Sequence, residues 1–333
     1  MSKGCTRAAM VPVTRRVRAY FAAVDRALGA PAIFDPAKWG VFELSAAPSP
    51  WFDLGWIDNF ERLSGSNTES VRTGSVNVTS LQYRSSVHAR VEFDFREWGK
   101  LQMALAGGVQ HMNVLEADPN AEPEPLGGTP LTAVAVVEGS TANEIQLGAG
   151  AVNRFAAGDM IAVDVDYTQQ TGFVGTGVAG AFVRSPADVL MDPHYIRRVT
   201  FNVGRVASAT ATSLLLEQPL LGGAPANGSS VQKIVAFADR EGGSFLQEWS
   251  AVFVMEEQSG GRICFYYPRL SPSAPDGGGP SGFLRERKIE IAEPIAAMAL
   301  HAAFVALPYR DRNDNEIAVC YRSYFPARAA ALY

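Results

Sequence analysis

Four ionisable side chains alternate with apolar ones along residues 87–95. Alternation of this length predicts a β-strand with one dry face and one hydrated face. The hydrated face of such a sheet lies either against bulk solvent or against a water-filled passage. The ionisable residues are His88, Arg90, Glu92 and Asp94, and the apolar residues are Val87, Ala89, Val91, Phe93 and Phe95.

The residue patterns that would support catalysis or metal binding are incomplete. The four histidines, at positions 88, 111, 194 and 301, show neither His-x-x-x-His spacing nor a cysteine close by in the sequence. No serine stands in a Gly-x-Ser-x-Gly motif. We therefore expect no catalytic residue, no cofactor site and no metal site, and a protein that is not an enzyme.

Two short segments match ligand-binding loops only in part. Residues 175–180, GTGVAG, have the spacing of a dinucleotide-binding loop, but the sequence around Pro186 gives no long amphipathic helix after it. Residues 311–316, DRNDNE, begin like a calcium-binding loop, but Glu316 stands where that loop requires glycine. We expect a loop at the first segment and, at the second, a hairpin turn in which Asn and Asp adopt left-handed conformations.

The composition is that of a globular, turn-rich protein. The 333 residues are 47% hydrophobic and 19% charged, with 31 Gly and 20 Pro, which favours many turns over disorder. This length predicts two domains or one domain with a large insertion. A formal net charge of -5 gives no general surface for gripping nucleic acid. The three cysteines are far apart and predict neither disulfides nor a metal site, as in a reducing compartment.

The apolar stretches are too short for targeting or for crossing a membrane. The stretch Tyr20–Val24 ends at Asp25 and is too short for the core of a signal peptide. No stretch approaches the roughly 18 to 20 apolar residues of a membrane span. We expect a protein that is synthesised in the cytoplasm and has no membrane partner.

Shifts in composition divide the chain into four segments. Residues 1–50 are irregular and rich in proline and predict an arm. The proline-rich and acidic stretch that opens residues 116–237 marks a boundary, and short β segments with Gly-rich turns follow it. We therefore predict that residues 51–115 and 238–333 form the core and that residues 116–237 form an inserted small β-barrel domain.

Strands dominate the predicted core. Residues 74–83 and 86–95 are predicted to be two strands joined by a tight turn. Residues 96–106 predict a short helix that ends at Gly107-Gly108, and a further short helix is predicted at 13–28. Other strands are predicted at 109–115, 249–256, 262–267, 283–292, 296–307 and 317–324.

Residues 51–60, WFDLGWIDNF, concentrate large aromatic side chains. Aromatic rings beside Asp can form an exposed stacking platform for a sugar or a peptide, or they can anchor a subunit interface, where aromatic residues are enriched. We favour interface anchors. The anchor residues are Trp51, Phe52, Trp56 and Phe60.

The order of these features points to a family. The segment WFDLGWIDNF is followed by the strand sequence GSVNVTSLQYRSSVHARVEFDF, the helix REWGKLQMALAGG, an insertion, FVMEEQSGGRICFYYPRL and the closing DRNDNEIAVCYRSYFP. This order resembles that of the major tail proteins, or tail tube proteins, of tailed bacteriophages. The resemblance covers residues 51–115 and 238–326 and includes no invariant motif.

The resemblance implies an all-β chain with one short helix, in which a tail-tube-like antiparallel β-sandwich or barrel carries the inserted domain. It also implies a structural virion protein of the tail, which forms hexameric rings that stack into a conduit for genome delivery. Its partners would be copies of itself and other tail proteins, with DNA only as passing cargo. The inserted domain would lie outside the tube, and the hydrated face of residues 88–94 would either line the lumen or contact a neighbouring subunit.

An alternative function remains open from the sequence. A carbohydrate-binding or adhesin-like β module would use the aromatic side chains of residues 51–56 as an exposed platform. Binding of glycans by a monomer would favour that alternative, whereas rings or tubes in the electron microscope would favour the tail tube.

Overall fold

The structure is a computed structural model, and it describes the ranges 13–39, 47–73, 77–97, 99–120, 131–164, 180–181, 195–240, 245–257, 260–273, 284–289 and 295–326. The chain folds as two compact units. One, the barrel unit, comprises residues 1–24, 30–108 and 247–333, and the other, the inserted unit, comprises residues 25–29 and 109–246. Antiparallel strands form most of the regular structure, so the predicted all-β class is confirmed.

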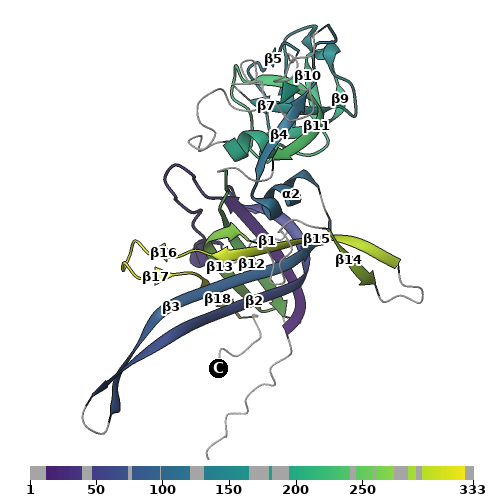
Figure 1. Ribbon diagram of the computed structural model, residues 1–333. Coiled ribbons are helices and arrows are strands. Elements are labelled where there is room, and N and C mark those ends of the chain that lie inside the picture. Colours follow the sequence, from purple (N-terminus) through teal and green to yellow (C-terminus); the bar gives the residue numbers. More distant parts are fainter. Residues whose placement is uncertain are drawn as a thin grey trace, which may run out of the picture. The chain divides into compact units, whose positions relative to one another are not determined.

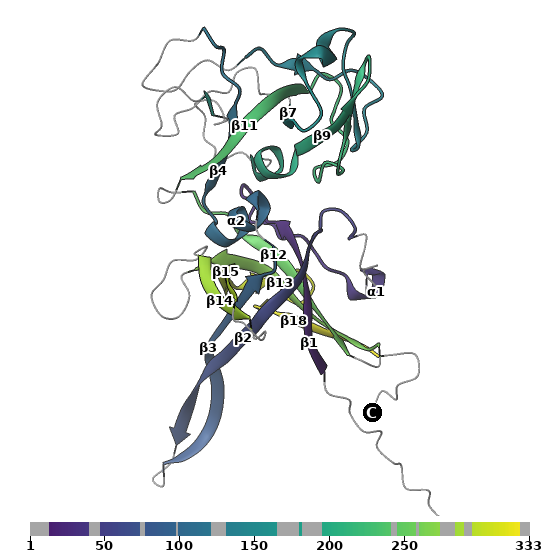
Figure 2. The ribbon, with the colours of Figure 1, turned by 90° about the vertical axis from the view of Figure 1, so that its right-hand side faces the viewer.

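Six strands of the barrel unit form a closed ring of antiparallel pairs (Figures 1 and 2). The order is β15-β3-β2-β1-β12-β13, and β13 pairs again with β15. β14 and β18 extend the sheet from β15 and β13. The bounds are β1 Val13–Ala23, β2 Phe52–Thr73, β3 Val78–Phe95, β12 Trp249–Glu257, β13 Arg262–Pro272, β14 Leu284–Ile289, β15 Ile295–Ala306 and β18 Tyr321–Phe325.

Phenylalanine side chains fill the interior of the barrel. Phe21 and Phe304 have ring centroids 5.6 Å apart, and Phe93 stacks on Phe304 at 5.9 Å. Phe253 meets Phe21 edge to face at 5.8 Å. All four rings are fully buried, and burial of each such side chain contributes roughly 1.5 to 3 kcal/mol.

The first strand, β1, is buried on both of its faces. Phe21 points into the barrel core, whereas Tyr20 and Ala22 lie in a second cluster with Phe34 and Trp51. The predicted helix at 13–28 is therefore wrong. Residues 13–23 of the predicted N-terminal arm are part of the barrel sheet, because β1 pairs with β2 on one side and with β12 on the other.

The hairpin of β2 and β3 turns at another place than the sequence predicts. β3 is one continuous strand, and the ladder with β2 runs to the pair Thr73 and Val78. The predicted turn near residue 84 is a bulge instead, since Ser85 has no partner between the pairs Asn67–Ser86 and Thr68–Arg84. The alternation of the sequence breaks there, but the chain does not turn back.

The predicted helix after β3 is confirmed as α2, Lys100–Gly107. Gly108 ends it with φ +57°, and its N–H donates to the carbonyl of Ala104 at 3.1 Å. A Cβ on Gly108 would lie 2.5 Å from Pro272, so only glycine fits this left-handed position without rearrangement. Leu105 is the fully buried leucine of the helix.

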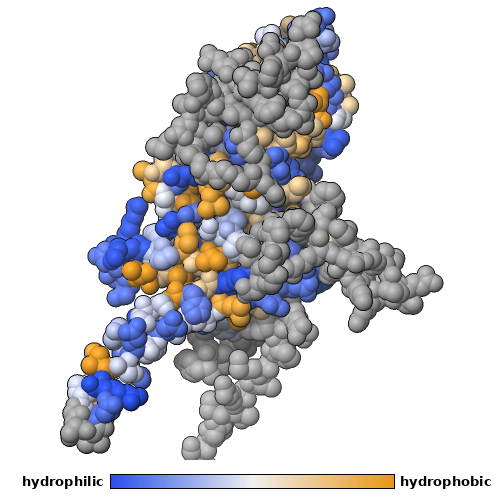
Figure 3. All heavy atoms as spheres, in the orientation of Figure 1, coloured by the Kyte–Doolittle hydropathy of each residue, from blue (hydrophilic) through white to orange (hydrophobic). Residues whose placement is uncertain are grey.

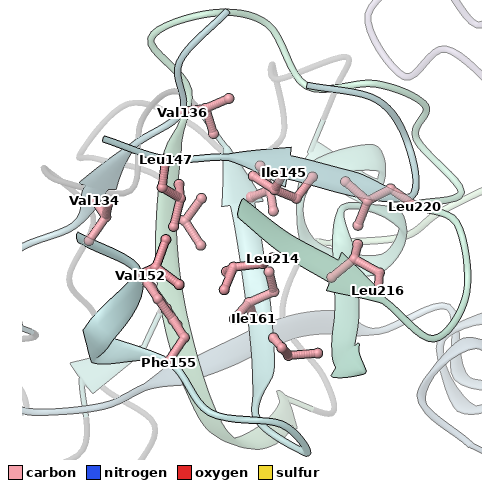
Figure 4. Packing of buried hydrophobic residues seen from close by; sticks show 13 residues of the cluster. Val134, Val136, Ile145, Leu147, Val152, Phe155, Ile161, Leu214, Leu216 and Leu220 are labelled. Atoms are coloured by element: carbon pink, nitrogen blue, oxygen red, sulfur yellow. The ribbon is translucent and has the colours of Figure 1, made fainter. Parts of the chain in front are cut away.

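The inserted unit has its own sheet and its own core (Figure 4). The strand order is β6-β10-β9-β7-β11-β4-β8, with β5 paired to β11. Its core is aliphatic except for Phe155. The bounds are β4 Gln110–Leu115, β5 Val134–Ala135, β6 Glu144–Gln146, β7 Met160–Asp164, β8 Gly180–Ala181, β9 Val203–Ala209, β10 Ser213–Leu216 and β11 Ser230–Arg240.

The inserted unit begins and ends outside the predicted boundaries of 116 and 237. β4, its first strand, pairs with the end of β11, so both strands belong to the same sheet. A π-helix, Arg197–Phe201, precedes β9. A short 3-10 helix, Ala151–Arg154, lies in this unit, and the one-turn helix α1, Pro36–Trp39, lies in the barrel unit.

The two partial motifs have different outcomes. Residues 311–316 form the predicted hairpin turn between β16, Tyr309–Arg310, and β17, Ile317–Ala318. Asn315 adopts φ +64°, and the Asp311 carboxylate accepts the Asn313 N–H at 2.9 Å. The motif at 175–180 lies outside the described residues apart from Gly180.

Candidate assembly surface

Three of the four predicted ionisable residues lie together on the outside of the barrel. Val91, Phe93 and Phe95 are buried, as the alternation predicts. The intervening Arg90, Glu92 and Asp94 therefore share the opposite, outer side of β3. We call the outer face of β2, β3 and β15 around these three residues the charged face.

Paired charges and hydrogen bonds connect the charged face. Arg90 Nε lies 2.7 Å from one carboxylate oxygen of Glu92. Asp94 accepts a hydrogen bond at 2.7 Å from Asn59 Nδ2 and contacts the ring of His301 at 2.7 Å. Asp94 and His301 are both buried. Asp94 thus connects β3 to β2 and to β15, whereas Arg90 and Glu92 pair within β3. The arrangement serves structure.

His88 lies further along the same strand, beyond the barrel. Its imidazole covers Gly65 of β2, and a Cβ at Gly65 would lie 2.4 Å from His88 Nε2. The ring therefore occupies the space that a side chain on β2 would fill. His88 is exposed and lies outside the hydrogen-bonded cluster of the charged face, so the four predicted residues do not form one site.

The predicted interface anchors lie in two environments. Trp51 and Phe52 are buried inside the barrel unit, against Tyr266 and Trp249 with centroids 6.2 Å and 6.1 Å away. Phe60 is partly exposed and packs on a core ring 4.9 Å away. Burial of the first two removes them from the surface of the monomer, where both an exposed sugar platform and an interface would need them.

Trp56, like Phe60, stays near the surface. The guanidinium carbons of Arg16 and Arg18 each lie 5.7 Å from the centre of its ring, within the range of cation–π attraction. Arg18 also forms an ion pair with Asp53. Trp56 is half-buried under these side chains, and Trp and Arg are both enriched among the residues that contribute most to binding at protein interfaces.

The β2–β3 ladder continues far beyond the barrel. β1 pairs with β2 only as far as Ile57, and β15 pairs with β3 only from Arg90 onward. Residues 64–73 and 78–88 therefore form a two-stranded ribbon with which no other described strand pairs. Figures 1 and 2 show it running away from the barrel, and we call it the arm.

One side of the arm carries its exposed apolar side chains, beside Glu69, and we call it the apolar side. The register pairs Val71 with Leu81 and Thr73 with Val78, and Tyr83 lies on the same side. The exposed fractions are 42% for Val71, 60% for Val78, 59% for Leu81 and 47% for Tyr83. Figure 3 shows apolar surface near the end of the arm among polar surface.

The other side of the arm is polar. Gln82 Nε2 donates to Ser70 Oγ at 3.2 Å, and Thr68 lies opposite Arg84. The apolar side follows directly from the charged face along β2, because Glu61, Leu63 and Val71 are separated by even numbers of residues. The charged face and the apolar side of the arm thus form one continuous surface along the outside of the barrel unit.

Other kinds of site find little support in the described part of the chain. Within those ranges, no three or more His, Cys, Asp or Glu side chains are grouped so that they could bind a metal ion. No described helix has both the length and the hydropathy of a membrane-crossing segment. The structure brings Asn59 of β2 and His301 of β15 against Asp94 of β3, and neither contact is predicted from the sequence.

Comparisons with known proteins leave the family open. No family model matches the chain, and no curated protein matches its sequence.

Proposed function

We propose that the chain is a structural protein that assembles with copies of itself into closed rings, and that the stacked rings form the tail tube of a bacteriophage or a related particle. The observation that supports this most is the arm. An isolated two-stranded hairpin is at best marginally stable in water. A long arm with an apolar side is therefore suited to a surface on another subunit, which would cover that side.

The barrel supports the same proposal. Its interior is filled by the Phe21, Phe93, Phe253 and Phe304 rings, so the barrel of one subunit leaves no room for cargo. A conduit would have to form between subunits. The charged face, which combines acids with arginines, is a surface for that ring contact or for its lumen. The net charge of -5 suits a wall along which DNA slides without tight binding.

The remaining parts of the proposal follow from the ring. The inserted unit has its own aliphatic core, and in a tube it would lie on the outside, because a folded domain would block the channel. Neighbouring rings and other tail proteins would be its partners, and the virion tail its location.

The test compares the full chain with a variant that lacks the arm. We replace residues 67–86 by Asn-Gly, a two-residue turn that hairpins favour. Light scattering and negative-stain microscopy should show rings or tubes for the full chain and only monomers for the variant. The denaturation curve of the variant should remain cooperative, because the barrel core is unchanged. A full chain that stays monomeric over a wide concentration range would overturn the proposal.

A matched pair of variants separates the two sides of the arm. Val71→Thr with Leu81→Thr makes the apolar side polar, whereas Ser70→Thr with Gln82→Thr changes the polar side by a similar amount. Assembly should be lost in the first variant and retained in the second. Equal loss in both would show that the length of the arm, and not its apolar side, matters.

A further inference from the structure

His301 is the ionisable residue of β15, a strand that is otherwise made of apolar side chains. It lies at the seam between β15 and β3, opposite Asp94 in the register. The side chain of His301 is 7% exposed and that of Asp94 is 11% exposed. A polar pair this deeply buried requires compensating hydrogen bonds.

The two ring nitrogens of His301 face two different carboxylates. Nδ1 lies 2.7 Å from Asp94 Oδ1, and Nε2 lies 3.3 Å from Glu92 Oε2. An ionised carboxylate can only accept a hydrogen bond. The short contact therefore requires the hydrogen on Nδ1. The second oxygen of each carboxylate has another partner, Asn59 for Asp94 and Arg90 for Glu92.

This geometry distinguishes the two charge states of the imidazole. A neutral ring has a hydrogen on one nitrogen and a lone pair on the other. With the hydrogen on Nδ1, the unprotonated Nε2 lies 3.3 Å from a carboxylate oxygen of Glu92, and two acceptor atoms this close repel each other. The imidazolium presents N–H groups on both sides. We propose that His301 is a proton-dependent clamp that holds β15 on β3 when the ring is protonated and weakens this seam when the ring is neutral.

The groups around the clamp carry more negative than positive charge. From β3 it faces Glu92, Asp94 and Arg90, and β2 places Asp58 and Glu61 in register with Asp94 and Glu92. Arg96 pairs with Asp58 at 2.9 Å. Together these residues supply four carboxylates and two guanidinium groups.

The other elements beside β15 contribute charge only at its flanks. β13 meets β15 through residues 270–272, which are uncharged. In β14, the charged residues 285–288 pair with Ala299 through Ala296 and not with His301. The helix α2 contacts β15, and its charged residue is Lys100. The charges in register with the clamp therefore come from β2 and β3.

The clamp lies where β15 closes the barrel through two short ladders. β15 pairs with β3 over residues 301–305 and with β13 over residues 304–306. The arm leaves the barrel just beyond this seam, after Leu63 and Arg90. Loss of the clamp should therefore loosen both the closure of the barrel and the root of the arm. This inference does not depend on the proposed tube.

Hydrogen exchange over a pH series tests the clamp on the full chain. Protection of the amides at 90–94 and 301–305, corrected for the intrinsic exchange rate, is measured from about pH 5 to about pH 9, the range in which histidine changes charge. Protection should fall roughly tenfold toward the alkaline end, where the neutral ring no longer attracts the two carboxylates. Constant protection in the wild-type protein would overturn the proposal.

Two variants test whether the pH dependence requires the carboxylate of Glu92. Glu92→Gln removes the negative charge beside Nε2, so a neutral ring is no longer repelled there and protection should no longer depend on pH. The control His88→Gln removes an exposed histidine from the same strand and should keep the wild-type dependence. A Glu92→Gln protein with the wild-type profile would contradict the clamp.

The tautomer of the neutral ring gives a readout that does not depend on any variant. In nitrogen NMR spectra of the wild-type protein, Nδ1 of His301 should remain protonated throughout the series while Nε2 loses its hydrogen. A neutral ring with its hydrogen on Nε2 would exclude the bond to Asp94 in that state, and with it the proposal. This measurement decides the question even where Glu92→Gln does not fold.

Discussion

The two halves of the β2–β3 ladder have the same backbone pairing and different surroundings. In the barrel half, Val91 and Phe93 are fully buried, and neighbouring strands pair on both sides. In the arm half, Val78 and Leu81 are more than half exposed, and both edges lack a described partner strand. The difference shows that regular pairing alone does not account for the stability of a strand. The barrel half is held by what it buries, whereas the arm half has its apolar side available for another molecule.

The largest expected effect separates the core of the barrel from the arm. Phe93→Ala removes a buried ring that contacts Phe21, Phe253 and Phe304. The free energy of unfolding should fall by about 3 to 5 kcal/mol, as for other Phe to Ala changes in cores. Denaturant unfolding monitored by fluorescence measures it. A loss below about 1 kcal/mol, the range of surface changes, would mean that the barrel interior is not the core.

The next effect is an alkaline loss of stability in the barrel. The pKa of Tyr20 is raised to about 12, mainly by burial and also by the nearby Asp53 carboxylate. Burial also raises the pKa of Tyr266 and of Tyr267. A pKa that is raised in the folded state gives stability below the ordinary value of about 10, and this stability is lost as the pH rises toward 12. The loss from Tyr20 alone should be on the order of 2 kcal/mol.

Tyr83 in the arm provides the contrast in the same titration. Its hydroxyl donates to Glu69 at 2.8 Å, and this bond raises its pKa. Because the side chain is exposed, it should ionise while the barrel stays folded. The tyrosinate absorbance measures both steps, and Tyr83→Phe should remove part of the step that precedes unfolding. Ionisation of all tyrosines in one cooperative step would contradict the distinction between arm and barrel.

A smaller effect is expected for an apolar residue of the arm. Leu81→Ala removes the cross-strand contact with Val71. The free energy of unfolding of the monomer should change by less than about 1 kcal/mol, since an exposed cross-strand pair contributes about that much or less. Denaturant unfolding at low protein concentration measures it. A loss as large as that of Phe93→Ala would mean that the arm is covered within the monomer.

The smallest effect concerns a single hydrogen bond on the arm. Tyr83→Phe keeps the ring and removes the bond to Glu69. Because this bond is exposed to water, the stability of the monomer should not change measurably. Gln82→Ala, which removes the bond to Ser70 on the polar side, is the matched control. Thermal unfolding of both variants should be indistinguishable from that of the wild type within about 2 °C.

Local signals explain what could be predicted from the sequence. The alternation over residues 89–95 predicts the buried side correctly, because one face of β3 meets a core and the other does not. Gly108 ends α2 as expected, since its left-handed conformation is one that glycine adopts easily. The hairpin of β12 and β13 is also confirmed. In each case the residues that determine the element are within the element or next to it.

The failures have physical causes as well. The prediction of a helix at 13–28 is wrong because Tyr20 and Phe21 are both buried, so the alternation that marks a strand is hidden. The turn near residue 84 was predicted because the bulge at Ser85 interrupts the alternation, and no local signal distinguishes a bulge from a turn. The link between Asp94 and His301 spans 207 residues of sequence. The sequence of β15 itself indicates a polar partner only through its single histidine, which stands in an otherwise apolar strand.

The ends of the inserted unit come together at one point of the barrel unit. The N–H of Gln247 donates to the carbonyl of Gly108 at 3.3 Å, and the side chain of Gln247 donates to the carbonyl of Val24 at 3.1 Å. The barrel therefore meets the inserted sequence as a loop whose two ends are fixed side by side. The entropy of closing a loop rises only slowly with its length, so this junction can accept segments of very different size. Evolution could exchange, enlarge or delete the domain here while the barrel and its arm stay unchanged, and a foreign domain with adjacent termini could be displayed from the same position.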